Sequence, residues 1–279
     1  AVEGHPAGEP MLREAFVPGK GRGMIATRAV HSGSIMFVEA PLLCTTTPGV
    51  RHACGLCLGD AVEFCELCDE GTCVICGPHA CKQPDKAERE LRGSVWYQLY
   101  ERYVGLVQQE EVEVDWSAFA RVPTSVYEDW DKFAAAAELF VSPVRRRMGF
   151  DQPAGSATSR ALTKEGFLDF YRLARANSAA VGDRGSAIFR MHACLNHSCS
   201  PNAVALRLMD YFPGALAQEG ATSGSRLHPG SIAILAERDI SADEEVCISY
   251  LHPDEEREEL TRRYGFTCRC PACGSSGEA

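Results

Sequence analysis

Three cysteines near the carboxyl end of the chain have the spacing of metal ligands. Cys268, Cys270 and Cys273 form a C-x-C-x2-C triplet, which supplies three of the four ligands of a tetrahedral zinc site. Cys199, in the distant segment 196–202 (Asn-His-Ser-Cys-Ser-Pro-Asn), can complete the set. The sequence therefore predicts a structural zinc ion that folds the end of the chain over the Asn-His pair, where we expect the active site to lie.

A second group of candidate ligands occupies residues 52–81. It contains two C-x2-C pairs, then a third pair and a His-x-Cys pair, and this gives the eight ligands that two tetrahedral zinc ions require. The segment has almost no apolar periodicity, so we expect metal binding rather than a core to order it. The alternative is one zinc ion with the other cysteines as buried free thiols. The ligands would be Cys54, Cys57, Cys65, Cys68, Cys73, Cys76, His79 and Cys81, and the whole chain would bind about three zinc ions.

Three other features could contact a small ligand. The loop 19–23 (Gly-Lys-Gly-Arg-Gly) lacks the Lys-Ser/Thr of a phosphate-binding loop, and such turns more often belong to a hairpin than to a cofactor site. Asn196 and His197 lie between an apolar run and a Ser-Pro-Asn turn, where the backbone can face a ligand, although a capped turn explains them equally well. Tyr250 ends an apolar strand and could be a core tyrosine with a satisfied hydroxyl.

Composition restricts the class of protein. The 279 residues are 45% hydrophobic and 24% charged, which is typical of a globular chain with a sizeable core. The net charge of -10 argues against binding to nucleic-acid backbones, and no run approaches the roughly 18 apolar residues of a membrane span. The first residues show no secretory leader, and the 14 cysteines are grouped as metal ligands rather than as a disulfide framework. We therefore expect a reducing compartment, nuclear or cytoplasmic.

Turns and short apolar runs predict strands at both ends of the chain. Near the start, Met24–Ala26 and Ile35–Val38 flank a turn at 31–33, and we expect these two runs to form a hairpin. Past Asn177 the pattern again favours short strands, over 186–189, 202–208, 231–236 and 246–250, with a polar loop over 214–230.

Residues 86–175 favour helices instead. Apolar side chains recur at four-residue spacing from Leu91 to Tyr103 and again from Phe167 to Ala174, and an Ala-rich stretch runs from 133 to 140. Pro123 and Pro143 should limit helix length. A short charged helix is expected over 255–263, and the fold class is therefore α+β.

Four segments in order along the chain resemble the motifs of SET-domain protein lysine methyltransferases. They are 20–27 (Lys-Gly-Arg-Gly-Met-Ile-Ala-Thr), 196–202, 244–250 (Glu-Glu-Val-Cys-Ile-Ser-Tyr) and 266–273 (Phe-Thr-Cys-Arg-Cys-Pro-Ala-Cys). The cysteine-rich insert before a helical region is similar to the arrangement in the SET-and-MYND family. The resemblance covers nearly all of residues 13–274.

The resemblance implies a mostly-β SET fold of short strands. By analogy, 13–47 is the first part of the SET domain, 52–85 a MYND-like zinc insert, 86–175 a helical insert, 176–252 the catalytic part and 253–279 a zinc-binding post-SET tail. The sequence departs from the family pattern at the third cysteine pair, which is C-x2-C and runs almost directly into the His-x-Cys pair. It also stops six residues past Cys273, so we expect either a truncated chain or a compact variant without the carboxyl-terminal helical domain of many members. The family's interleaving would place Cys54, Cys57, Cys73 and Cys76 on one zinc ion, and Cys65, Cys68, His79 and Cys81 on another.

The family binds S-adenosylmethionine and methylates a lysine that reaches the cofactor through a narrow channel. Tyr250 matches the tyrosine at the methyl-transfer channel, and Tyr264 an aromatic residue that lines it, so the resemblance makes these two residues the catalytic candidates. The residues implied to contact the cofactor are Lys20, Arg22, Gly23, Asn177, Ala193, Asn196, His197, Tyr250 and Phe266.

The implied chemistry is an in-line methyl transfer, in which the protein mainly aligns the reacting groups. An apolar channel beside a sulfonium lowers the pKa of the substrate lysine from about 10.4, so no dedicated general base is needed. Aromatic walls could also hold a methylammonium by cation–π attraction. The expected partner is a histone or another protein with an exposed lysine, and a peptide that binds the zinc insert is a second candidate partner.

The competing hypothesis is a catalytically inactive, zinc-dependent interaction module. The MYND type often binds proline-containing peptides, and some SET-like folds are inactive. Retention of Tyr250, Asn196 and His197 together favours the enzyme, because a pure binding module needs none of them. A nucleic-acid-binding zinc protein suits the acidic chain poorly.

Overall fold

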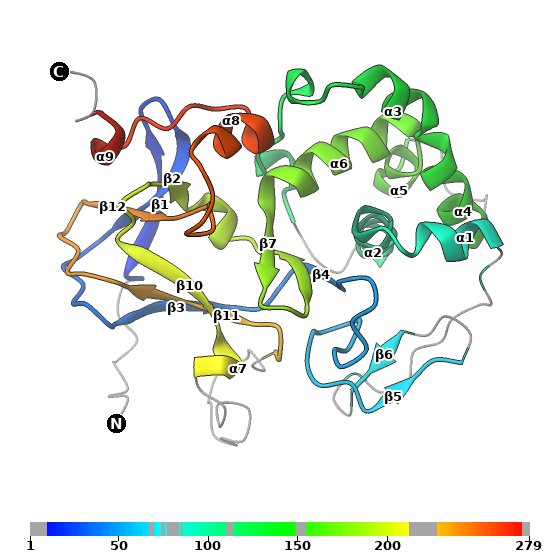
Figure 1. Ribbon diagram of the computed structural model, residues 1–279, viewed down its shortest axis with the longest axis horizontal. Coiled ribbons are helices and arrows are strands. Elements are labelled where there is room, and N and C mark those ends of the chain that lie inside the picture. The colour runs from blue at the N-terminus through cyan, green and yellow to red at the C-terminus, as the bar shows by residue number, and fades with distance from the viewer. Residues whose placement is uncertain are drawn as a thin grey trace.

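The structure is a computed structural model that describes residues 10–66, 70–73, 76, 84, 86–109, 114–148, 155–211 and 228–274. It has an α+β fold in which most of the short strands lie on one side of the molecule and the helical region of residues 86–177 on the other (Figure 1). The strands are β1 (Leu12–Val17), β2 (Gly21–Ala26), β3 (Ile35–Glu39), β4 (Leu43–Thr46), β5 (Glu63–Phe64), β6 (Gly71–Thr72), β7 (Ser178–Val181), β8 (Gly185–Ile188), β9 (Asn196–His197), β10 (Ala203–Arg207), β11 (Ile232–Ala236) and β12 (Glu245–Ile248). The helices are α1 (Lys86–Leu91), α2 (Val95–Gln109), α3 (Trp130–Ala136), α4 (Glu138–Met148), α5 (Ala157–Ala161), α6 (Lys164–Asn177), α7 (Leu208–Tyr211), α8 (Glu258–Tyr264) and α9 (Pro271–Gly274), with 3-10 turns η1 (Trp116–Ala118), η2 (Thr124–Val126) and η3 (His192–Cys194).

The first sheet brings distant motifs side by side. Its strand order is β1-β2-β12-β9, with β12 antiparallel to β2 and parallel to β9. Cys247 of β12 is paired with Asn196 of β9, and Glu245 is paired with Ile25 of β2. The ends of these strands therefore meet at one place, where the candidate site residues gather.

The predicted hairpin of Met24–Ala26 with Ile35–Val38 is wrong. β2 pairs instead with β1, through the turn 18–20, whereas β3 pairs with β11 in a separate sheet of order β10-β11-β3. Gly19 and Gly21 adopt positive φ values of 77° and 86° at this turn, which glycine accepts at little cost. The glycine-rich loop is therefore a turn, as expected, but it joins β2 to the preceding strand β1.

A third sheet, β4-β8-β7, connects the two hydrophobic cores. Successive residues of a strand face opposite sides of its sheet. Leu43 and its partner Ile188 pack in the core of the helical half, whereas the next pair, Cys44 and Ala187, packs in the core of the strand-rich half. The two halves are therefore joined by one sheet that is covered on both faces.

The helical region forms as expected, with shorter helices than the periodicity indicates. α2 and α6 bury aromatic rings against each other, and the rings of Tyr100 and Phe167 meet edge-on at 5.0 Å. The run from Leu91 to Tyr103 is broken between α1 and α2, and the Ala-rich stretch is divided between α3 and α4. Pro143 does not end a helix as expected, because it lies inside α4.

The cysteine-rich insert is anchored on the strand-rich half by an apolar side chain. Leu58 is fully buried in the core that includes Phe189 and Val181, and its φ of 59° belongs to a tight turn. Arg184 donates to the Leu58 carbonyl oxygen at 3.3 Å and forms an ion pair with Asp60 at 2.6 Å. The insert therefore contributes a side chain to the core of the strand-rich half. The 214–230 loop prediction falls largely outside the described residues.

Candidate active site and zinc centres

A cavity of about 980 Å³ lies where the first sheet, the helical region and the carboxyl-terminal segment meet. Every predicted cofactor or catalytic residue lines it except Gly23. The predicted residues on its wall are Lys20, Arg22, Asn177, Ala193, Asn196, His197, Tyr250, Tyr264 and Phe266. This space is of the size expected of a cofactor site.

Gly23 lies just behind the cavity wall. A Cβ atom at this position would stand 2.6 Å from Val17 and 2.9 Å from the Asn196 amide nitrogen. Such contacts are shorter than real Cβ atoms show, so only glycine lets β2 approach Asn196 this closely. Gly23 therefore supports the position of Asn196 and is not itself part of the wall.

Lys20 extends from the turn between β1 and β2 to the first sheet. Its ammonium donates to Glu245 Oε2 at 2.6 Å and lies 3.8 Å from the Cys247 sulfur. Partial burial lowers the pKa of Lys20, but the hydrogen bond to Glu245 and the nearby Cys247 outweigh it, so the pKa lies above its ordinary value. Lys20 is therefore a fixed positive charge at the cavity.

Asn196 is held by two acceptors. Its side-chain Nδ2 donates to the Arg22 carbonyl oxygen and to Glu245 Oε1, both at 2.9 Å. Glu245 thus joins Lys20 and Asn196, one through each carboxylate oxygen. Glu245 belongs to the motif 244–250, but the sequence did not predict its contacts with these two cavity residues.

His197 connects the cavity to the carboxyl-terminal cysteines. Its Nδ1 accepts a hydrogen bond from the Tyr250 backbone N–H at 3.0 Å, and its Nε2 lies 3.3 Å from Cys199 Sγ. Burial lowers the pKa of His197 to about 4, with a smaller contribution from the positive charge of Lys20. The ring is therefore neutral near pH 7, with its proton on Nε2 and directed at the sulfur.

Three aromatic rings surround the inner part of the cavity. Tyr250 lies 5.2 Å from Tyr264 and 6.4 Å from Phe266, measured between ring centroids. The Tyr250 hydroxyl donates to the Leu195 carbonyl oxygen at 2.6 Å. Burial, with Tyr264 nearby, raises the pKa of Tyr250 well above its ordinary value, so the phenol stays neutral. The three rings together form an aromatic wall of the cavity.

Gly265 places two of these rings. It ends α8 in the left-handed conformation with φ 77°, and a Cβ there would stand 2.9 Å from Pro123 and Val126 of the helical region. The turn at Gly265 therefore docks the carboxyl-terminal segment on η2, with an aromatic residue on either side.

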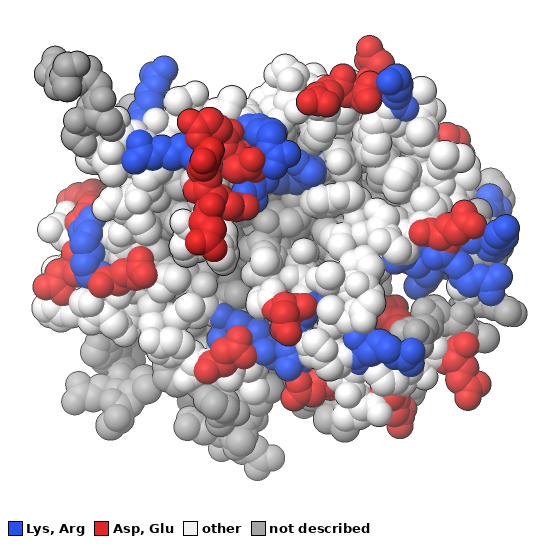
Figure 2. Space-filling model, in the orientation of Figure 1, with Lys and Arg blue, Asp and Glu red and all other residues white. Residues whose placement is uncertain are grey.

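Acidic side chains gather over α8 and the segment before it (Figure 2). Within α8, Glu259 pairs with Arg263 at 3.1 Å.

Asn177 and Ala193 approach the cavity from the helical region and from η3. The Asn177 amide donates to the carbonyl oxygens of Ala120 and Leu173 at 2.9 and 2.7 Å, so it ties α6 to the segment after η1. η3 is held by Glu39, whose carboxylate accepts the backbone N–H groups of residues 190, 191 and 192 at 2.7 to 3.0 Å. Burial is the main cause that raises the pKa of Glu39. Sequence reasoning missed Glu39.

The helical region supplies a wall that the sequence did not predict. Ala118, Ala120, Arg121 and Val122 line the cavity from the segment between η1 and η2. Arg121 forms a two-pronged ion pair with Asp169 of α6 at 3.0 and 2.8 Å and donates to the Trp116 carbonyl oxygen at 2.9 Å. No motif marks this segment, so only the three-dimensional packing places it at the site.

The carboxyl-terminal cysteines form a four-sulfur group with Cys199. Cys199, Cys268, Cys270 and Cys273 place their sulfur atoms within 4.8 Å of one another. The sulfurs of Cys199 and Cys273 are 3.5 Å apart, close to the edge of about 3.8 Å expected for a tetrahedron with Zn–S bonds of about 2.3 Å. The group could therefore hold a zinc ion, and two of its members, Cys268 and Cys270, also line the cavity.

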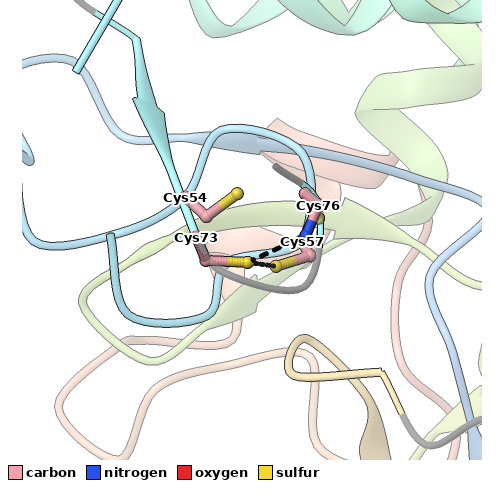
Figure 3. A group of neighbouring side chains, drawn as sticks. All are labelled: Cys54, Cys57, Cys73 and Cys76. Carbon is pink, nitrogen blue, oxygen red and sulfur yellow. Dashed lines mark hydrogen bonds between the residues drawn. The ribbon is translucent and has the colours of Figure 1, made fainter. Parts of the chain in front are cut away.

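A second four-sulfur group lies in the insert (Figure 3). It joins Cys54 and Cys57 to Cys73 and Cys76, as the interleaved pairing predicts, and the sulfurs of Cys57 and Cys73 are 3.4 Å apart. Both four-sulfur groups could therefore bind zinc. Of the other predicted ligands, Cys65 is partly exposed, and Cys68, His79 and Cys81 lie outside the described residues.

Two curated relatives of this chain are lysine methyltransferases by name. The mouse N-lysine methyltransferase SMYD2 is 26% identical over 280 residues, which cover 91% of this chain and 58% of that protein. The histone-lysine N-methyltransferase ATXR2 of Arabidopsis thaliana is 37% identical over 103 residues, or 34% of this chain and 18% of that protein. The chain thus spans less than two thirds of either relative.

A solved structure titled as the SET domain of LSMT bound to lysine and AdoHcy is 14% identical to this chain, with a TM-score of 0.45. The match covers 94% of this chain and 54% of that one.

None of the described helices is long and apolar enough to span a membrane. The family model for the SET domain matches residues 21–251, most of the chain. The protein therefore belongs to the SET-domain family.

Proposed function

We propose that this protein is an S-adenosylmethionine-dependent protein lysine methyltransferase. One observation carries the proposal: Tyr250, Tyr264 and Phe266 form an aromatic wall in the same cavity that contains Lys20 and Asn196. The aromatic end suits an alkyl amine, and the polar end suits a ligand with charged groups. The names of the relatives, both lysine methyltransferases, support the same activity.

The donor set fits the proposed cofactor. Lys20 offers an ammonium to a carboxylate, Asn196 offers a side-chain oxygen to an ammonium, and the exposed ring of Phe266 offers an apolar face to a base. When bound, the cofactor supplies an activated methyl group. Gly23 permits the close approach that holds Asn196 in place.

The chain's own residues would prepare the lysine for attack. The neutral Tyr250 phenol and the Tyr264 ring make a low-dielectric channel, which disfavours the charged form of an amine. The Leu195 carbonyl oxygen, already bound to the Tyr250 hydroxyl, fixes the direction of that hydroxyl. Alignment in this channel, rather than a general base, would be the main contribution to the rate.

A zinc ion on Cys199, Cys268, Cys270 and Cys273 would fix the last wall of the cavity. Phe266 lies two residues before Cys268, and both line the cavity. With this zinc ion bound, the segment that bears Phe266 and Tyr264 cannot swing away from the site. We therefore assign this zinc ion a structural role that activity depends on.

The substrate would be a histone or another protein with an exposed lysine, in the nucleus or the cytoplasm. The grouped cysteines favour such reducing compartments. Peptide binding by the insert is a second candidate function, favoured by the exposed side chains of Val62 and Phe64. Loss of peptide binding in Val62→Asp, with unchanged methylation of a peptide that does not contact the insert, would separate the two.

Calorimetry with zinc-loaded protein tests the proposal. We expect S-adenosylmethionine to bind, and labelled cofactor to mark lysines of proteins in a cell extract, as identified by mass spectrometry. Absence of cofactor binding by folded, zinc-loaded protein would exclude the methyltransferase. Cofactor binding without any labelled lysine would instead favour an inactive interaction module.

A further inference from the structure

A single carboxylate organises the polar end of the cavity. Glu245 Oε2 accepts a hydrogen bond from Lys20 Nζ at 2.6 Å, and Glu245 Oε1 accepts one from Asn196 Nδ2 at 2.9 Å. Its side chain is only 19% exposed, and it lies on β12, between the turn that bears Lys20 and the strand that bears Asn196. Glu245 itself is not on the cavity wall, so it acts through these two residues.

The contacts of Asn196 determine which end of its amide is left for a ligand. An asparagine amide nitrogen has two hydrogens, and here they meet the Arg22 carbonyl oxygen and Glu245 Oε1. The reversed amide would place its oxygen against two acceptors, so this orientation is the one the surroundings accept. The remaining hydrogen-bonding atom is Oδ1, an acceptor. Asn196 can therefore receive a hydrogen bond from a ligand but has no donor left to give.

Lys20 has the complementary chemistry. Its ammonium has three hydrogens, one of which meets Glu245, while another is directed towards the Cys247 sulfur at 3.8 Å. A remaining hydrogen can bind a ligand carboxylate. A positive donor beside a neutral acceptor matches the carboxylate and ammonium of an α-amino acid.

We propose that Glu245 is a positioning residue that orients Asn196 and Lys20 to recognise the amino-acid end of the cofactor. The inference rests on the proposed function, because the ligand concerned is S-adenosylmethionine or its product. Glu245 makes Asn196 an acceptor and holds Lys20 in place, so the pair selects a zwitterion over a ligand that lacks either charged group. The adenosine end is recognised elsewhere and does not depend on Glu245.

The neighbouring residue provides a matched control. Glu244 also accepts a hydrogen bond from an asparagine amide, that of Asn202, at 2.9 Å, and it accepts one from Arg238 at 2.7 Å. Neither of these partners lines the cavity. Glu244→Gln therefore removes the same charge, from a similar hydrogen-bonded site one residue away, without touching the polar end of the cavity.

The test compares two ligands by calorimetry on zinc-loaded protein. S-adenosylhomocysteine has the amino-acid end, and 5′-methylthioadenosine lacks it. In Glu245→Gln we expect the affinity for S-adenosylhomocysteine to fall about 10-fold or more, the scale of a lost charge-assisted hydrogen bond. We expect the affinity for 5′-methylthioadenosine to stay within about 2-fold, and Glu244→Gln to leave the affinities for both ligands unchanged.

Equal losses for both ligands would show that Glu245 only supports the fold, and unchanged S-adenosylhomocysteine binding would also overturn the proposal. Failure of the wild-type protein to bind either ligand would instead count against the proposed function. If Glu245→Gln does not fold, the wild-type protein still tests the orientation of Asn196. An analogue of S-adenosylhomocysteine with hydrogen in place of the α-amino group should then bind about 10-fold more weakly, and equal binding would contradict an acceptor at Asn196.

Discussion

The backbone N–H of Tyr250 donates a hydrogen bond to Nδ1 of His197 across 3.0 Å. The opposite nitrogen of the same ring lies 3.3 Å from the sulfur of Cys199. One neutral imidazole therefore spans the gap between the candidate catalytic tyrosine and a candidate zinc ligand. Through it, the position of the tyrosine depends on the cysteine group at the end of the chain.

Removing the Tyr250 hydroxyl should affect the reaction more than the binding of the cofactor. In Tyr250→Phe the ring and its packing against Tyr264 remain, but the hydrogen bond to the Leu195 carbonyl oxygen is lost. We expect turnover to fall by about 10-fold or more, or the degree of methylation to change, with cofactor affinity nearly unchanged. Steady-state kinetics and intact-mass analysis of the product measure both, and an unaltered rate and product would remove Tyr250 from the catalytic residues.

Gly265→Ala should disturb the aromatic wall. An L-residue pays about 1 to 2 kcal/mol in the left-handed conformation, and the new Cβ would also press on Pro123 and Val126 at 2.9 Å. Gly33→Ala is the control, because its φ of 79° is nearly the same and no atom lies within 4 Å of the added Cβ. We expect both variants to lose stability in thermal unfolding, but only Gly265→Ala to weaken S-adenosylhomocysteine binding. Equal cofactor affinity in the two variants would disprove the role of this turn.

Glu39→Ala should loosen the segment that leads into Asn196. The carboxylate accepts three backbone N–H groups, from residues 190 and 191 and from the first residue of η3, and loss of these hydrogen bonds should lower the free energy of unfolding by about 3 kcal/mol. Because Ala193 of η3 lines the cavity, cofactor affinity should fall as well. Denaturant unfolding and calorimetry check the two effects. Glu237→Ala, at an exposed position after β11, should change neither the stability nor the cofactor affinity. A Glu39→Ala variant as stable as wild type would show that the hydrogen bonds of Glu39 do not stabilise this segment.

The two cysteine groups should differ in their effect on the site. Elemental analysis of the wild-type protein should give about three zinc ions per chain, and a value near one would exclude a two-zinc insert. Cys268→Ser should lose one zinc ion and much of the cofactor affinity, because Cys268 lines the cavity. Cys54→Ser should lose zinc and stability, since the insert buries Leu58 in the SET core, but should retain more of the cofactor affinity. Identical cofactor affinities in the two variants would contradict this division.

Stability should fall in mild acid because of His192. Burial lowers its pKa to about 4, below the value of about 6.5 in an unfolded chain. The unfolded state therefore binds a proton first, so the stabilisation is complete above about pH 6.5 and is lost as the pH falls towards 4. His192 Nδ1 is buried without a hydrogen-bond partner among the described residues, so His192→Phe removes no such contact there. Denaturant unfolding across this range should show a weaker pH dependence in His192→Phe than in wild type, and an equal pH dependence in the two proteins would contradict this role of His192.

Motif residues could be placed from the sequence because each carries its chemistry in its type and spacing. The C-x-C-x2-C triplet and Cys199 do meet, and Asn196, His197 and Tyr250 do line one cavity. The predicted hairpin is wrong because a turn signal does not say which strands it joins: the turn 18–20 joins β2 to β1 and not to β3. Strand pairing between β2 and β12 depends on contacts between the two ends of the chain, which local patterns do not contain.

Supporting residues were harder to find than functional ones. Glu39 and Glu245 act through hydrogen bonds to segments far away in sequence, and an isolated glutamate gives no indication of such a role. Arg121 approaches the cavity only because its ion pair with Asp169 holds the segment between η1 and η2 against α6. These positions follow from packing, and no spacing rule predicts them.

The order of the first sheet has a consequence for synthesis on the ribosome. β2 leaves the ribosome well before its second neighbour, β12, because the helical region and most of the other strands lie between them in the sequence. Until then one edge of β2 has unpaired backbone groups, and Asn196 lacks the carboxylate that sets its amide. The nascent chain can therefore complete its helical half while the cofactor cavity is still open. The wall of the cavity that contains Cys268 and Cys270 is added only after β12.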